Sequence, residues 1–390
     1  MIRKFTLTAL CALVTSPAVA GGWETGKLDT SFLYEDGNYA DLSYGSLDYA
    51  INATIQNDTS HKMAKDQTRQ ALSAKFTIGN IDVGITSFDS GAIQMDGQSA
   101  AVNRGDCATA VAAISSNPAL ALAQQGVDAA TNCSVVASAD VMVNTQAILV
   151  NYNINDSFSV IGGLRKANVD NSTVQTLKTN YAVDKVSKSG MIYGAAYQIP
   201  DIALKLEFMY SEAIEMGLTG NASGLMAPAT LAFASDSKMA IPKATTIKFQ
   251  TGIAEDTLLM ASAHRVNWSA AQIDVNIAGA SSLDVESEFS DTTAYSVGLG
   301  RKFTEKTSGS LSYSWEKGAG ATSGSGFTMS NGSKTLSLGL KHQTNNLTLS
   351  GGVSYTKVGD VDVSALGGLL TAAYADNSVT AVGLKASFDF

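Results

Sequence analysis

The chain has 390 residues and a formal net charge of −9, and 45% of its residues are hydrophobic while only 16% are charged. An acidic chain without basic clusters excludes nucleic-acid binding as its main role. His61, His264 and His342 are scattered and belong to no metal or hydrolase motif, so we expect no enzyme activity, no metal and no cofactor.

Residues 1–20, MIRKFTLTALCALVTSPAVA, begin with basic residues, continue with a short apolar run and end with small residues. This pattern predicts a cleaved secretory signal peptide, and the run is too short to span a membrane. Loss of Arg3 and Lys4 would leave 24 basic and 35 acidic residues, a net charge of about −11. Residues 21–38 then form a short segment before the first predicted strand.

From residue 39 onward, apolar and polar residues alternate, which predicts β-strands. In SKTLSLGLKHQ, Leu336, Leu338 and Leu340 share one face, and the other face carries small and polar residues. A small, polar second face in strand after strand favours a barrel with a polar lumen surrounded by lipid over a soluble sandwich. The fourteen predicted strands are 39–50, 70–79, 81–89, 143–153, 157–168, 188–199, 202–216, 242–254, 257–269, 292–303, 307–317, 333–343, 347–358 and 377–390.

The connections alternate between tight turns and long loops. The turns are GNID, NIND, IPDI, AEDT, TEKT and TNNL, and the loops are 51–69, 90–142, 169–187, 217–241, 270–291, 318–332 and 359–376. This asymmetry predicts an all-β fold over residues 39–390, namely a transmembrane antiparallel β-barrel of about 14 strands. The turns and both chain ends would be periplasmic, and the loops would lie outside the cell.

Aromatic residues lie near several strand ends. Tyr39, Tyr355, Trp268 and Trp315 are predicted to anchor the barrel at the membrane interfaces. The chain ends in VTAVGLKASFDF, and its terminal Phe390 indicates recognition by the barrel-assembly machinery, the alternative being an ordinary last strand.

Four charged residues are candidates for a site inside the barrel. Alternation places Arg165, Lys248 and Lys385 on the lumen faces of their strands, where a cation could bind a ligand carboxylate. The alternative is that they pair with acids in solvated networks, such as one that includes Glu207. Gly84, within the third strand, marks either a bulge or bend or a position that simply tolerates glycine.

The stretch from 107 to 133, CATAVAAISSNPALALAQQGVDAATNC, is an apolar insert in the longest loop, about 90–142. Cys107 and Cys133 are the only cysteines after the signal peptide, so export predicts a disulfide between them, and two thiols without nearby histidine are a poor zinc site. Asn117 and Pro118 indicate the start of a short helix. The insert would present its apolar side chains as a ligand-capturing lid, or it would pack on neighbouring loops and close the mouth. The four apolar lid candidates are Val111, Ile114, Leu120 and Leu122.

Several spaced segments resemble the outer-membrane long-chain fatty-acid transporter family, the FadL type that includes aromatic-hydrocarbon channels. They are FLYEDGNYADLSYGSLDYA, YQIPDIALKLEFMYSEAIE, FQTGIAEDTLLMASAHRVNWS and YADNSVTAVGLKASFDF. The resemblance implies a monomeric fourteen-stranded barrel in outer-membrane lipid, an N-terminal hatch in the lumen, and an apolar capture groove in the extracellular loops. It also implies passive passage of long-chain fatty acids or other hydrophobic small molecules, with release sideways through the barrel wall.

Two features depart from the family. Residues 21–38 are shorter than the usual hatch, so the plug is expected to be small or partial. The Asn-Pro-Ala motif of the hatch is missing there, and the NPA at Asn117, Pro118 and Ala119 lies in an extracellular loop and is treated as coincidence. The alternative function is therefore a general diffusion porin for small polar solutes, which the polar lumen face and the short N-terminal segment favour.

Overall fold

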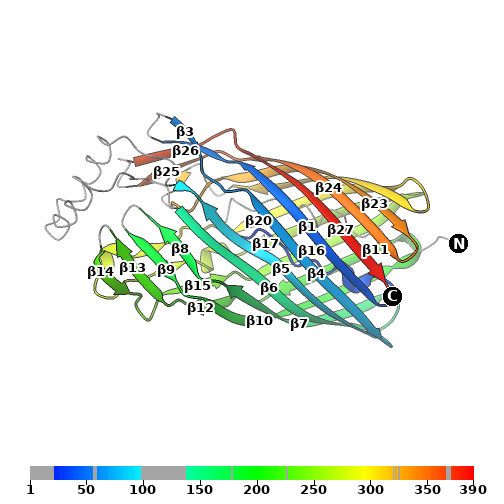
Figure 1. The fold of residues 1–390 in the computed structure, drawn as a ribbon. Helices are drawn as coiled ribbons and strands as arrows, with labels where there is room; N and C mark the ends of the chain where they lie inside the picture. The colour runs from blue at the N-terminus through cyan, green and yellow to red at the C-terminus, as the bar shows by residue number, and fades with distance from the viewer. Residues whose placement is uncertain are drawn as a thin grey trace.

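The chain folds into a closed antiparallel barrel, in which the first barrel strand pairs with the last (Figure 1). The structure is a computed structural model and describes residues 22–55, 59–97, 138–176, 179–224, 227–318, 320, 322–323, 326–365 and 370–390. Within these ranges fourteen strands, each overlapping a predicted one, pair with their neighbours in chain order, as predicted. The barrel strands are β1 (Tyr39–Ala50), β4 (Gln67–Ile78), β5 (Ile81–Met95), β6 (Ser138–Asn153), β7 (Phe158–Val169), β10 (Val186–Ile199), β11 (Leu204–Ser211), β16 (Ala244–Ala254), β17 (Thr257–Val266), β20 (Thr292–Lys302), β21 (Thr307–Lys317), β23 (Gly332–Thr344), β24 (Leu347–Val358) and β27 (Ser378–Asp389).

The two faces of the barrel wall follow the alternation in the sequence. On β23, Leu336, Leu338 and Leu340 are 51%, 53% and 55% exposed on the outer face, whereas Thr335 faces inward and is 1% exposed. Side chains of successive strand residues point to opposite faces. The alternation in the sequence therefore fixes which residues of each strand face outward and which face the lumen. The result is an apolar outer surface around a polar interior, the reverse of a soluble protein and the arrangement that a lipid environment requires.

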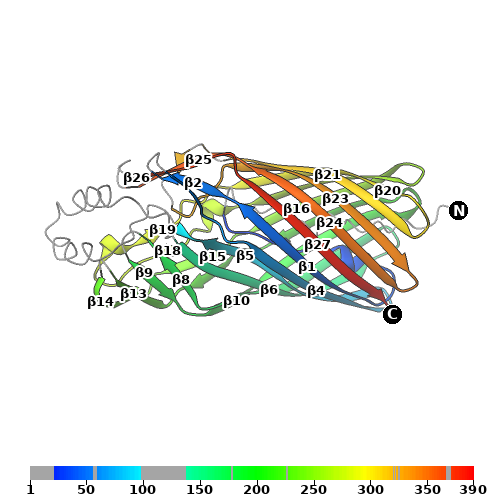
Figure 2. The ribbon, with the colours of Figure 1, turned by 45° about the horizontal axis from the view of Figure 1, so that its top comes forward.

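One end of the barrel carries the tight turns and the other carries the long connections (Figures 1 and 2). Gly79, Asp256 and Asn345 take positive φ angles of 63°, 55° and 53° at three of the turns. Glycine, asparagine and aspartate tolerate this left-handed conformation better than other residues, which explains why these turns are tight. We call the two ends the turn end and the loop end.

The long connections at the loop end are not irregular, which the sequence did not predict. Four short strands extend the barrel wall, and nine others form two small sheets at this end (Figure 2). The wall extensions are β8 (Ser172–Gln175), β9 (Asn180–Val183), β13 (Gly220–Gly224) and β14 (Ala227–Ala232). One small sheet comprises β2 (Asn52–Ile55), β3 (Thr59–Lys62), β22 (Thr322–Ser323), β25 (Val361–Ala365) and β26 (Leu370–Tyr374), and the other comprises β12 (Ile214–Gly217), β15 (Lys238–Ile241), β18 (Asp274–Val275) and β19 (Val285–Glu286).

Helical structure in the described ranges is limited to single turns of 3-10 helix. They are η2 (Ser31–Tyr34), η4 (Pro200–Ile202), η5 (Trp268–Ala270) and η6 (Ser281–Leu283). No helix in these ranges is long and apolar enough to cross a membrane.

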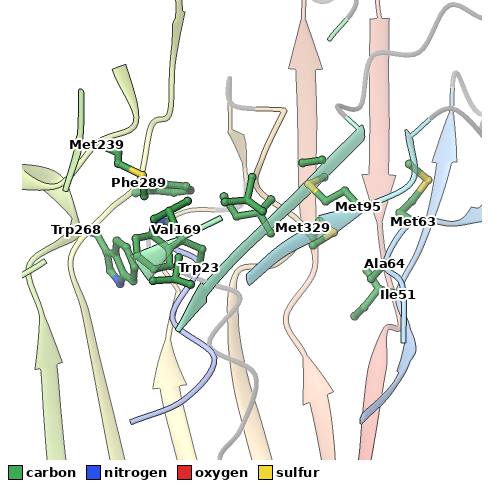
Figure 3. Packing of buried hydrophobic residues seen from close by; sticks show 14 of the residues in the cluster. Trp23, Ile51, Met63, Ala64, Met95, Val169, Met239, Trp268, Phe289 and Met329 are labelled. Atoms are coloured by element: carbon green, nitrogen blue, oxygen red, sulfur yellow. The ribbon is translucent and has the colours of Figure 1, made fainter. Parts of the chain in front are cut away.

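A large apolar cluster joins both small sheets to the loop end of the barrel wall. Five of its members are methionines, and it also contains Trp23, Trp268 and Phe289, beside which Met239 lies (Figure 3). We call it the methionine cluster; its methionines are Met63, Met95, Met216, Met239 and Met329. Because methionine is flexible and polarizable, such a cluster can rearrange around a guest more readily than one built from branched residues.

Two of the four predicted membrane anchors are wrong. Trp268 is 1% exposed in η5 and contacts Trp23, with ring centroids 5.3 Å apart. Tyr39 is 3% exposed and shares the inner face of β1 with Asp41. Trp315 and Tyr355 are exposed on the outer face, as expected of anchors, at 39% and 55%.

Candidate functional site

The segment of residues 22–38, here the N-terminal segment, lies inside the barrel against β5. The amides of Thr25 and Gly26 donate to the Ser90 carbonyl, at 3.0 and 3.1 Å, and the Ala92 amide donates to the Trp23 carbonyl at 3.0 Å. Ser90 is the extra residue of a bulge, since the β5–β6 register shifts between Asp89 and Gly91. A bulge leaves a residue outside the ladder. The Ser90 carbonyl is therefore available to hold the N-terminal segment.

The N-terminal segment makes its second contact with β5 at Gly84, where η2 packs against the strand. A Cβ atom at Gly84 would lie 2.6 Å from Leu33 Cδ2 and 2.7 Å from Phe32 Cε2. Both side chains are fully buried in η2. The glycine is therefore neither a bulge nor an indifferent position: its missing side chain makes room for η2, and the bulge of this strand lies near Ser90 instead.

Thr30 of the N-terminal segment joins a buried ion pair on the barrel wall. Lys248 Nζ lies 3.1 Å from Glu207 Oε1, and Glu207 is 1% exposed. The Thr30 hydroxyl donates to Glu207 at 2.6 Å and accepts from Lys248 at 2.9 Å. These bonds satisfy a carboxylate that would otherwise be costly to bury, so the pair and the segment stabilise each other.

Asp29 and Glu35 make two further polar attachments. Lys385 Nζ lies 3.0 Å from Asp41 on β1 and 3.9 Å from Asp29. Nearer the turn end, Lys75 is 2% exposed, lies 3.7 Å from Asp82, and donates to the backbone carbonyl of Glu35.

Glu24 forms the attachment nearest the loop end. Its Oε2 lies 2.9 Å from His264 Nε2, and the other ring nitrogen of His264 lies 2.8 Å from the Thr246 hydroxyl. Burial by itself raises the pKa of the Glu24 carboxyl, but the charge and hydrogen bond of His264 hold that pKa below its ordinary value. Burial likewise opposes ionisation of Asp29, and the charge of Lys385 overcomes it and lowers the pKa. Both acids therefore hold the segment as carboxylates.

The structure places all four predicted charged residues toward the lumen but does not bring them into one cluster. Lys248 and Glu207 pair with each other, and Lys385 pairs with acids nearer β1. Arg165 lies apart and donates from one nitrogen to the carbonyls of Glu212 at 2.5 Å and Pro242 at 3.2 Å. Among the described residues, its buried Nε has no acceptor.

Two cavities flank the N-terminal segment. One, of about 110 Å³, is bounded by charged and hydroxyl groups including Asp29, Asp41 and Lys385. The other, of about 50 Å³, has apolar walls from residues including Trp23, Trp268, Ile192 and Met209. Its charged and titratable lining groups are Glu24, Arg165, Lys248 and His264. Sites for drug-sized ligands are roughly 300–1,000 Å³. A ligand of that size therefore fits neither cavity unless the segment or the methionine cluster moves.

The predicted lid lies outside the described residues. This applies to Val111, Ile114, Leu120 and Leu122 and to the Cys107–Cys133 disulfide, which all remain predictions.

Sequence reasoning missed three acidic residues of the site. Glu24 and Asp29 attach the N-terminal segment to the barrel wall, and Asp41 pairs with Lys385, the lysine that Asp29 approaches. Strand alternation could have placed Asp41 on the inner face of β1, beside Tyr39. Glu24 and Asp29 lie in a segment that is expected to enter the lumen, and the lumen also holds cations. This was a weaker indication that the two acids form ion pairs there. Nothing in the sequence indicates that Glu24 meets His264, 240 positions away.

The fold is similar to those of a FadL homologue and of two toluene transporters. A Pseudomonas aeruginosa FadL homologue has a TM-score of 0.68 at 13% identity, over 92% of this chain and 92% of that chain. The Pseudomonas putida toluene transporter TodX has a TM-score of 0.61 at 12% identity, over 97% and 96%. The Ralstonia pickettii toluene transporter TbuX has a TM-score of 0.58 at 11% identity, over 98% of both chains.

No protein-family model and no curated protein matches the sequence. The likeness to solved structures, at low identity but over nearly the full length of each chain, shows that this chain has their fold. It confirms the fourteen-stranded barrel expected from the sequence.

Proposed function

We propose that this protein is an outer-membrane channel for the passive uptake of hydrophobic compounds, with its loop end outside the cell and its turn end in the periplasm. The apolar outer face of the barrel supports insertion in a bilayer. The names of the similar structures, a FadL homologue and two toluene transporters, support a hydrophobic cargo. Residues 1–20 would direct export, and the C-terminal strand ending in Phe390 would be read by the assembly machinery.

One observation carries the proposal: the protein's own N-terminal segment occupies the lumen beside an apolar cluster. The segment is held by the Ser90 carbonyl and by charged groups on several strands. The methionine cluster lies above it. A diffusion porin needs an open aqueous path, whereas a channel for hydrophobic ligands benefits from an apolar entrance and a plug that excludes water. We therefore propose that residues 21–38 act as a short hatch.

The finer proposal is that the cargo is a long-chain fatty acid or a similar amphipathic compound. The smaller cavity combines apolar walls with Arg165 and Lys248. Arg165 has a buried Nε without an acceptor among the described residues, and a ligand carboxylate would supply one. A monoaromatic hydrocarbon has no group for this donor, so the cation favours an acid over toluene.

The insert closed by Cys107 and Cys133 would capture the ligand outside the cell. Apolar residues Val111, Ile114, Leu120 and Leu122 give it the chemistry of a hydrocarbon-binding surface. A disulfide across a loop of this length contributes roughly 3 to 4 kcal/mol in the chain-entropy account, enough to hold short helices that are marginal alone. Unchanged fatty-acid affinity in a folded barrel carrying Cys107→Ser and Cys133→Ser would refute the lid.

Equilibrium binding of a labelled long-chain fatty acid to the purified barrel in detergent tests the proposal. We expect saturable binding that excess unlabelled long-chain acid displaces, whereas toluene, a short-chain acid and a sugar displace it much less. Displacement by toluene at similar concentrations would contradict the fatty-acid assignment but keep the hydrophobic channel. Absence of saturable binding for both hydrophobic ligands would contradict the channel itself.

A further inference from the structure

One wall of the barrel carries a row of basic residues on its outer face at the loop end. They belong to the adjoining strands from β16 to β24: Lys243 precedes β16, Arg265 ends the outer row of β17, and Lys317, Lys334 and Lys357 lie at the loop-end termini of β21, β23 and β24. All five side chains are exposed. We call this set the basic row. Charged side chains on a lipid-facing wall are costly at mid-membrane but are tolerated near the interface.

The strand register sets two lysines of the basic row directly side by side. Lys334 pairs with Lys357 across β23 and β24, and Trp315 pairs with Lys334 across β21 and β23. Directly opposed residues have Cβ atoms about 4.5–5.5 Å apart, and opposed like charges destabilise a sheet. The arrangement therefore favours an anion that bridges both ammonium groups.

Carboxylates among the residues that the structure describes neutralise the basic row only in part. Within the described part of the chain, no ion pair is found for Lys317 or Lys334. Lys357 has only the exposed Asp376 at 3.9 Å, and Arg265 has Asp291 at 3.6 Å.

The opposite wall, around β7 and β10, arranges its cations differently. There Lys185 is paired with Asp170 at 2.9 Å, and the exposed Lys166 and Lys188 have no cation directly opposite them in the strand register. Two lysines directly opposed in the strand register are therefore a feature of the β23–β24 wall.

Aromatic rings lie just below the basic row and indicate the depth at which it lies. Trp315 stacks between Tyr295 and Tyr313, with centroids 5.5 and 5.9 Å away. Tyr355 lies on the outer face two residues before Lys357 and is 55% exposed. Tryptophan and tyrosine gather where acyl chains meet headgroups. The lysines above them therefore lie at headgroup level in the leaflet facing the loop end.

From these observations we infer that the basic row is a binding site for a phosphorylated lipid headgroup of the outer leaflet. A phosphate would lie between Lys334 and Lys357, with Lys317 beside it, while the acyl chains would run down the apolar wall past Trp315. Lysine ammonium groups bind phosphate through charge-assisted hydrogen bonds, and interfacial lysines attract anionic lipid. The inference rests on the proposed outer-membrane location, but it concerns the outer wall and not the lumen.

Binding of fluorescent diphosphoryl lipid A to the purified full-length barrel in non-ionic detergent tests the site. The variant is Lys334→Gln with Lys357→Gln. The control is Lys166→Gln with Lys188→Gln, which removes the same charge from β7 and β10, where both lysines are exposed at the loop end. At about fivefold per interfacial lysine, we expect the first pair to weaken binding roughly 30-fold and the control pair to change it less than about threefold.

Two further arms identify the source of the phosphate. Lipid A without its phosphates should bind the parent barrel as weakly as the intact lipid binds the variant. Inorganic phosphate at millimolar concentration should not displace the lipid; displacement would indicate a small-anion site and overturn the lipid assignment. Equal losses in the two double variants would also overturn it. Fatty-acid binding in the lumen should be unchanged in both double variants. Loss of fatty-acid binding would therefore concern the transport proposal, and loss of lipid A binding alone would concern the site on the outer wall.

Discussion

Replacing Gly84 with leucine should loosen the N-terminal segment and let the barrel conduct. The Cβ atom alone would come within 2.6 Å of Leu33 and 2.7 Å of Phe32. Both contacts are with side-chain ends, but these side chains are 1% and 0% exposed and have little free space to turn into. Overpacking of this kind costs about 1–3 kcal/mol.

That strain is smaller than the cost of expelling the segment. Exposing Phe32 and Leu33 would lose about 1.5–3 kcal/mol for each side chain. The segment should therefore stay seated most of the time, while the unseated fraction rises by a factor of about 5 to 150.

Single-channel recording in planar bilayers measures this fraction as the time spent conducting. The control is Gly162→Leu on β7, where an added Cβ meets nothing within 4 Å. It introduces the same side chain into the same barrel without touching the segment. Equal conducting time in Gly84→Leu and the parent, or an equal rise in Gly162→Leu, would refute the assignment of Gly84 as the seat of η2.

Three other predictions concern the polar groups of the lumen. Lys248→Met should lower the free energy of unfolding in urea by about 3 kcal/mol, because the Glu207 carboxylate would be buried without its partner. Adding Glu207→Met should restore most of this loss, and no restoration would contradict the pairing. Because the pKa of Glu24 is lowered in the seated segment, seating is favoured above its ordinary pKa of 4.5 and weakens as the pH falls through the lowered pKa. Conducting time should rise in acid, and less so in Glu24→Gln. Arg165→Gln should weaken binding of a long-chain fatty acid about 10- to 100-fold but leave toluene binding unchanged, and an equal loss for both ligands would contradict a carboxylate contact.

The barrel strands could be predicted because a lipid-facing wall imposes strict alternation. In β23 the run Leu336, Leu338 and Leu340 allows only one assignment of faces, since a shift by one residue would put polar groups in lipid. Turn residues such as Asn345 then set the strand ends. The same alternation placed Arg165, Lys248 and Lys385 toward the lumen without showing what each would meet there.

The loop end could not be predicted in the same way. Its short strands pair residues far apart in the chain, such as Thr54 with Ala373, and no lipid face imposes a pattern on them. The sequence predicts Trp268 at the membrane interface because it lies near a strand end, but η5 turns it inward onto Trp23. The attachments of the N-terminal segment depend likewise on distant residues, and only the folded barrel brings Glu24 to His264 and Thr30 to Glu207.

Transport across a bilayer tests the central claim most directly. The purified barrel would be placed in liposomes, and entry of a long-chain fatty acid would be followed with an internal probe, beside entry of a sugar and a parallel series with empty liposomes. A plugged channel for hydrophobic ligands should speed saturable entry of the fatty acid and leave the sugar excluded. Sugar entry at a rate set by solute size, without saturable acceleration of the fatty acid, would contradict it and indicate a diffusion porin.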